Sequence, residues 1–169
     1  MFLRALKLTA LPVIAFSCSA LAEEAHVHGE AVMEIVIDDA GALISFEAPA
    51  IDIVGFEYLP KTDAEQAAID AKIELLSDMA SVVLLPEAAG CSVSDVHVDF
   101  EAEEHDGEVE HIAFHAEYEL TCSDAGKLTS LEATVFDQFP DLEEMEVEVV
   151  TPSVQKGSHV EPGETSLEL

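Results

Sequence analysis

Alternation of apolar and polar residues predicts most of the strands in this chain. The clearest case is residues 111–122, where apolar side chains occupy every second position and histidine and glutamate predominate between them. A hairpin is predicted near the start, because an Asp-Ala-Gly turn at 39–41 separates two alternating segments. Together the expected strands are residues 31–38, 42–48, 93–100, 111–122, 145–150 and 166–169.

Two helices are predicted from apolar residues at helical spacing. The first begins at a capping box, in which Thr62 can accept a backbone amide hydrogen and Glu65 can reach back, and it is expected to end before Pro86. The second is expected from Lys127 to about residue 139, just before a proline. The element order is therefore ββαββαββ. Adjacent strands joined by short turns predict an α+β fold, with an antiparallel sheet and both helices packed on one face.

The first residues are typical of a secretory signal peptide. Arg4 and Lys7 precede an apolar run at 8–17, which is too short to span a membrane, and a small-x-small site ends at Ala22. We therefore expect a signal peptide over 1–22, cut near Ala22, and a periplasmic mature protein that is not inserted in the membrane.

The remaining residues, 23–169, are numerous enough for one domain with a core of its own, and we expect a single α+β metal-binding domain. The alternative for the N-terminus is a lipoprotein with Cys18 lipidated. Phe16 and Ser17 before that cysteine are unlike the residues of a lipidation signal.

The chain is strongly acidic, with 36 Asp and Glu against 6 Lys and Arg and a formal net charge of −30. Such a field repels nucleic acid and anionic lipid, and it raises the local concentration of cations. We therefore expect no nucleic-acid partner. Solubility, or adaptation to a salty medium, would give the same composition.

Two cysteines remain after the predicted cleavage, Cys91 and Cys122. In an oxidising compartment an even pair indicates a disulfide, which would stabilise the domain by ~3–4 kcal/mol in the chain-entropy model. The alternative is a metal site with two thiolate ligands. We predict the disulfide, because exported thiols tend to oxidise.

Histidines gather on one predicted hairpin. If a three-residue turn is centred on Asp106, His115 faces His97 and His111 faces Glu101, while the apolar residues of both strands share the other face. Directly opposed Cβ atoms are ~5 Å apart, so two such imidazoles can chelate one ion, and a mixture of imidazole and carboxylate favours zinc over calcium. Its outward face is expected to carry His97, Asp99, Glu101, His111, His115 and Glu117.

Other histidines are weaker candidates. His26 and His28 project to the same side of an extended chain, so both rings can turn toward one ion. His105 lies in the hairpin loop and can swing toward either group, whereas His159 is isolated. Against all these metal sites stands the ordinary alternative that polar residues on the outer face of a half-buried sheet are solvated side chains.

Several segments resemble the ZrgA family of zinc-regulated periplasmic proteins. They are His-Val-His-Gly at 26–29, Ser-Phe-Glu-Ala-Pro-Ala at 45–50, Ile-Val-Gly-Phe-Glu-Tyr at 53–58, Ala-Ala-Gly-Cys at 88–91, Tyr-Glu-Leu-Thr-Cys at 118–122 and Val-Phe-Asp-Gln-Phe-Pro at 135–140. The resemblance covers nearly the whole predicted mature chain, and the Pro-Ala to Val-Gly-Phe-Glu stretch is its most specific part.

The resemblance implies zinc binding in the periplasm and assistance to zinc uptake, together with an ABC-type or related transport system. Relatives often carry a long loop rich in histidine and aspartate between the two cysteine-flanked strands. Here that loop is only 103–108, short and mostly acidic, so one or two sites are expected rather than a high-capacity store.

Two alternatives to a zinc-binding accessory protein remain at this point: a metal-independent protein-interaction module, and an unspecific acidic buffer for cations that include calcium. No nucleophile motif, phosphate-binding loop or HExxH helix occurs in the sequence, so we expect no enzyme. Histidine ligation predicts that zinc affinity falls as the pH drops through ~6.5, whereas binding by carboxylates alone persists.

Overall fold

A six-stranded sheet forms the main layer of the protein, with strand order β4-β5-β2-β1-β7-β8. The computed structural model describes residues 27–105 and 108–169, so the predicted signal peptide, Cys18 and His26 lie outside the described residues. The strands of this sheet are β1 Glu30–Ile37, β2 Gly41–Pro49, β4 Cys91–His105, β5 Glu108–Cys122, β7 Glu144–Val150 and β8 Gln155–Val160.

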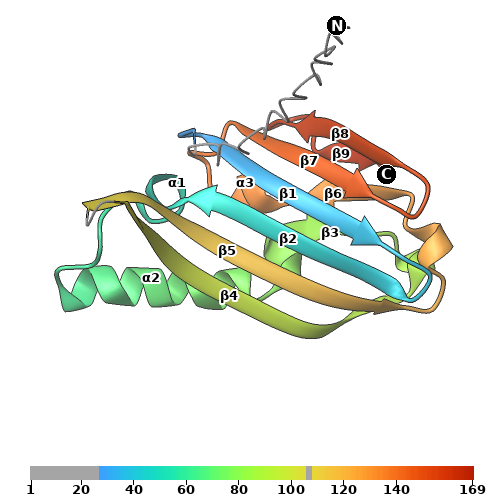
Figure 1. The fold of residues 1–169 in the computed structure, drawn as a ribbon, viewed down its shortest axis with the longest axis horizontal. Helices are drawn as coiled ribbons and strands as arrows, with labels where there is room; N and C mark the ends of the chain where they lie inside the picture. The colour runs from blue at the N-terminus through green and yellow to red at the C-terminus, as the bar shows by residue number, and fades with distance from the viewer. Residues whose placement is uncertain (1–26, 106–107) are drawn as a thin grey trace, which may run out of the picture.

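A second layer covers one face of this sheet (Figure 1). It contains a three-stranded sheet of order β3-β6-β9 and the one long helix in the described part of the chain, α2. The elements are α1 Ala50–Val54, α2 Asp63–Leu76, β3 Val83–Leu84, β6 Ser130–Ala133, α3 Val135–Gln138 and β9 Ser166–Glu168, with 3₁₀ turns at Met79–Ser81, Glu87–Ala89 and Ala125–Lys127. The predicted α+β class is confirmed. No helix among the described residues is long and apolar enough to cross a membrane.

The core lies between the two layers, and strand alternation places its residues there. Along β1, exposed and buried residues alternate at every position, which leaves Met33 and Ile35 inside. Tyr118 of β5 is fully buried, and its hydroxyl donates a hydrogen bond to the Leu76 carbonyl at 2.6 Å, which ties the end of α2 to the sheet. On the opposite face of the six-stranded sheet, no helix or strand of the described residues covers the strands.

A local signal in the sequence sets the start of α2, and the two cysteines pair as predicted. Thr62 caps the helix by accepting a hydrogen bond from the Glu65 amide at 3.2 Å, as the capping box predicts. Cys91 and Cys122 are directly opposed on β4 and β5 and form a disulfide, so this prediction is also confirmed.

The predicted helix from Lys127 to about residue 139 is wrong. In its place, Ser130–Ala133 is strand β6, which pairs with both β3 and β9, and only Val135–Gln138 is helical. Leu131 and Ala133 are buried while the residue between them is exposed, which is strand periodicity. Leu131 also fits a helical spacing together with Leu128, Val135 and Phe139, and pairing with two partner strands decides between helix and strand.

The sheet is not antiparallel throughout. β1 pairs with β7 in parallel, because the chain crosses beneath the main sheet after β5 and re-enters it beside β1. The strand expected at 166–169 is confirmed as β9, which lies at the edge of the small sheet.

Candidate metal-binding site

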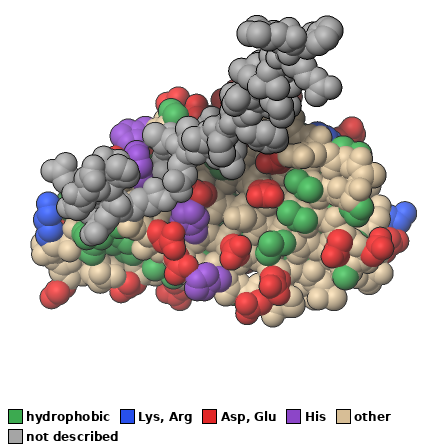
Figure 2. All heavy atoms as spheres, in the orientation of Figure 1, with side chains coloured by type: hydrophobic (Ala, Val, Ile, Leu, Met, Phe, Trp, Pro, Cys, Tyr) green, Lys and Arg blue, Asp and Glu red, His purple; other side chains and the backbone are tan. Residues whose placement is uncertain are grey.

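The hairpin of β4 and β5 carries histidines and carboxylates on the open face of the main sheet. His97 lies directly opposite Glu117, and Asp99 lies directly opposite His115, so all four side chains project to the same side. Figure 2 shows histidine and acidic side chains gathered over β4 and β5 on this face, with hydrophobic side chains toward the other end of the sheet.

The predicted register of this hairpin is wrong by two residues. His97 and His115 are therefore not opposed, and Glu101 lies opposite Ala113 instead of His111. Two features cause the shift: His105 pairs with Glu108, so the connection has two residues instead of three, and the register shifts again at a bulge beside Glu103.

Four of the predicted ligands nevertheless meet in one shallow hollow of about 170 Å³. Its lining residues are Ser45, His97, Asp99, Glu101, His115 and Glu117. His115 is central: its Nδ1 lies 3.3 Å from Glu47 Oε2, and its Nε2 lies 3.9 Å from Glu101 Oε2. We call these six residues together with Glu47 the hairpin site.

Asp99 lies next to both histidines of the hairpin site. Its carboxylate contacts His97 Nε2, and its backbone position is directly opposite His115 on the neighbouring strand. Directly opposed residues have Cβ atoms ~4.5–5.5 Å apart, which is within the span of two ligands of one ion. Two imidazoles with a carboxylate between them form a donor set that zinc favours and calcium does not.

The donor atoms have not converged. Among residues 27–105 and 108–169, no group of three or more His, Cys, Asp or Glu side chains is already arranged to hold a metal ion. The His97 side chain is 67 % exposed and that of Glu101 is 59 % exposed, so both have room to change rotamer. Coordination at the hairpin site therefore requires side-chain rotation over a strand framework that already places the ligands on one face.

His111 does not join the hairpin site. It lies opposite Glu103, on the same face as His115 but four residues away along β5, which is about 13 Å at the rise of a strand. Its place on the outward face is as predicted, but the predicted pairing with Glu101 is not found. Nothing is described of the His105 side chain.

His28 lies just before β1, four residues before Val32, which is level with Glu47 and His115 in the sheet. Its Nε2 is 3.0 Å from Glu57 Oε2, and the amide of the next residue, Gly29, donates a hydrogen bond of 2.8 Å to Asp52 Oδ2. Burial raises the pKa of the Asp52 carboxyl above its usual range, although the Gly29 hydrogen bond and the nearby His28 act in the other direction. His28 therefore belongs to a separate group of polar residues.

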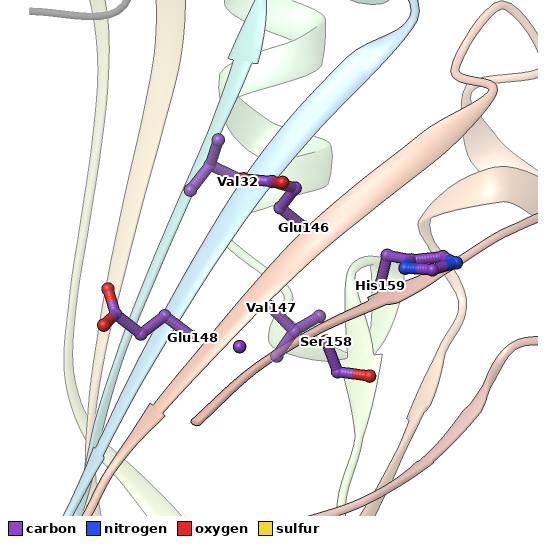
Figure 3. A pocket seen from close by; sticks show the side chains of 7 residues that line it. Val32, Glu146, Val147, Glu148, Ser158 and His159 are labelled. Carbon is purple, nitrogen blue, oxygen red and sulfur yellow. The ribbon is translucent and has the colours of Figure 1, made fainter. Parts of the chain in front are cut away.

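His159 lines a different hollow, between β1, β7 and β8 (Figure 3). It is directly opposite Glu146, yet the polar ends of Glu146, Glu148 and His159 point in different directions in the close-up. Its Nε2 is 3.8 Å from Glu161 Oε1. This hollow does not bring a set of ligands together.

Three residues of the hairpin site, Ser45, Glu47 and Asp99, were not among the predicted ligands. Asp99 had a usable signal, because strand alternation puts it on the face of His97 and Glu101. Glu47 had none, because it lies on β2, and only the pairing of β2 with β5 brings it beside His115.

A family model described as ZrgA family zinc uptake protein matches residues 25–169. The match includes every element of the fold described above and both groups of histidines with their carboxylate neighbours. The comparison with curated proteins finds no match.

Proposed function

Because the chain belongs to the ZrgA family of zinc uptake proteins, we propose that it binds zinc in the periplasm and assists its uptake through the hairpin site. One observation supports the assignment to that site more than any other. His97 and His115 stand on adjacent strands with Asp99 between them, on the open and strongly acidic face of the sheet. The proposed role is binding without turnover.

In the proposed complex, His97 and His115 supply two nitrogen ligands and Asp99 supplies an oxygen ligand. Zinc is usually four-coordinate, with nitrogen and oxygen ligands at ~2.0–2.2 Å, so one further carboxylate or a water completes the shell. Glu47 and Glu101 both contact His115, and an outer carboxylate that accepts a hydrogen bond from a ligating imidazole fixes its orientation.

Export supports the proposed location. The predicted signal peptide directs the chain out of the cytoplasm, and a Cys91–Cys122 disulfide is what an oxidising compartment favours. We propose an ABC-type or related zinc transport system as the partner that receives the ion.

The alternative with a specific observation in its favour is an unspecific acidic buffer. The chain has a net charge of −30, and carboxylates such as Glu34 and Glu148 share the open face with the hairpin site. A buffer of this kind would bind calcium and zinc through carboxylates alone, with no need for either histidine.

The test is zinc titration of the untagged protein at neutral pH, with the number of bound ions and their affinity measured against a competing chelator. In the double variant His97→Ala/His115→Ala, we expect the ion at the hairpin site to be lost, an affinity decrease of more than ~100-fold. The matched control is His111→Ala/His159→Ala, which removes two other histidines of the same face and should keep that ion.

Two results would contradict the proposal. One is unchanged zinc binding in His97→Ala/His115→Ala. The other is a protein that binds calcium as tightly as zinc, which would favour the acidic buffer.

A further inference from the structure

We propose a second divalent-metal site at the N-terminal end of β1, formed by His28, Asp52 and Glu57. The inference deepens the proposed function, because it gives the same protein a second ion beside the start of β1, which β2 separates from the hairpin strands. The three residues come from three segments: the turn before β1, helix α1, and the chain that follows Gly55.

Two of the three side chains are in contact, and the backbone holds the third beside them. His28 Nε2 contacts Glu57 Oε2 at 3.0 Å, and Asp52 Oδ2 accepts the Gly29 amide hydrogen at 2.8 Å, which holds Asp52 against the backbone next to His28. Both His28 and Glu57 are close enough to act electrostatically on Asp52. The side chain of His28 is 62 % exposed and that of Glu57 is 30 % exposed, so an ion can reach the group from solvent.

Asp52 is the unusual member of this group. Among the described residues it is the only charged one that is buried, with 8 % of its surface exposed. A carboxylate taken out of water without a cation is destabilising, and here Asp141 and Glu57 add repulsion from two further carboxylates. A dication held by Asp52, Glu57 and His28 would offset the cost of burial and the repulsion together.

The backbone presets the position of His28. The Gly29 carbonyl accepts hydrogen bonds from the amides of Glu143 at 2.7 Å and Glu144 at 3.0 Å, so the turn is fixed to the start of β7. Gly29 has φ 87°, a left-handed conformation that suits glycine, and an added Cβ would lie 3.3 Å from Glu143 Cγ. A site held on fixed backbone loses little conformational entropy when the ion binds.

Gly55 plays the corresponding role for Glu57. It ends α1 with φ 83°, and its amide donates to the Ile51 carbonyl at 2.9 Å. The chain therefore turns sharply after the helix and brings Glu57 back toward His28, close to the helix that carries Asp52.

The donor set distinguishes this site from the hairpin site. It has one imidazole and two carboxylates, whereas the hairpin site has two imidazoles. More oxygen and less nitrogen reduces the preference for zinc over harder divalent ions such as manganese. We therefore expect zinc at both sites, with weaker discrimination against manganese at the His28 site.

The experiment counts bound zinc in the untagged full-length protein, as the host processes it, by equilibrium dialysis and metal analysis. The test variant is His28→Ala/Asp52→Asn, in which the asparagine oxygen can still accept the Gly29 hydrogen bond and the fold is kept. Asp141→Asn is the matched control, because it removes a nearby negative charge without removing a proposed ligand. Circular dichroism of the metal-free proteins checks that each variant is folded.

We expect the wild type and Asp141→Asn to bind two zinc ions per chain and His28→Ala/Asp52→Asn to bind one. In the wild type, excess manganese should displace zinc from the His28 site before it displaces zinc from the hairpin site. If the wild type binds one ion, and His97→Ala/His115→Ala removes it while His28→Ala/Asp52→Asn does not, the second site is refuted and the hairpin site stands. If the single ion is instead removed by His28→Ala/Asp52→Asn and kept in His97→Ala/His115→Ala, the second site stands and the hairpin site is refuted.

Discussion

Protons and zinc should compete for the histidines of the hairpin site. The pH dependence of zinc affinity should therefore be steeper for two ligating imidazoles than for one. Each ligating imidazole must be neutral, so binding one ion to both His97 and His115 excludes two protons. Zinc affinity is then highest at pH values at which both imidazoles are neutral, and it decreases as the pH falls and the imidazoles take up protons. The perturbation is a pH series between 7.5 and 5, above the range in which most carboxylates take up protons.

The magnitude follows from the number of ligands. At the reference imidazole pKa of ~6.5, the neutral fraction of a model imidazole falls about 8-fold between pH 6 and pH 5. With two such ligands, zinc affinity should fall about 60-fold between pH 6 and pH 5, and with one ligand it should fall about 8-fold. Carboxylate binding alone would change little over the same interval.

The assay is calorimetric zinc titration of the His28→Ala/Asp52→Asn protein, which isolates the hairpin site. Repeating each titration in two buffers of different ionisation enthalpy gives the number of protons released. His97→Ala in this background should reduce the 60-fold change to about 8-fold. A wild-type hairpin site whose affinity is flat from pH 6 to pH 5, or falls only 8-fold, would refute ligation by both histidines.

Three further predictions concern stability, measured by urea unfolding. Tyr118→Phe leaves the buried Leu76 carbonyl without its donor and should cost about 1–3 kcal/mol with an unchanged m-value; an unchanged midpoint would contradict this. Gly41→Ala places a Cβ 1.8 Å from the Leu120 carbonyl oxygen and should lower the free energy of unfolding by about 3 kcal/mol or more. An unfolding midpoint equal to that of the wild type would contradict this prediction. Reducing the disulfide should lower the free energy of unfolding by about 3–4 kcal/mol, and equal curves with and without reductant would disprove that.

The sequence predicted the parts of the fold that depend on neighbouring residues. The faces of β1, β2 and β5 followed from alternation, because one face of each strand packs on the core. The start of α2 followed from the capping interaction of Thr62 with Glu65. The segment around Leu131 was predicted wrongly, because its apolar spacing fits two periods and the deciding hydrogen bonds come from β3 and β9, far away in the chain.

The candidate ligands divide in the same way. His97, Glu101, His115 and Glu117 were predicted because a single hairpin presents them. Glu47 and Asp52 were not, since each reaches its histidine from another element, and an acidic chain offers many equivalent carboxylates. No local pattern distinguishes Asp52 from other aspartates; its burial does, and burial is a property of the folded chain.

The hairpin register explains why four of the predicted ligands still lie together although the predicted pairing is wrong. A shift of one residue would have turned β4 over and pointed His97 toward the core, because β2 fixes the face of β5. The observed shift of two keeps both histidines outward and changes only the partner of His115, to Asp99. The hydrophobic pattern opposes odd shifts strongly and even shifts hardly at all, because an even shift buries the same face. Which histidine meets which carboxylate therefore depends on the turn length and the bulge near Glu103, and these reposition ligands without affecting the core.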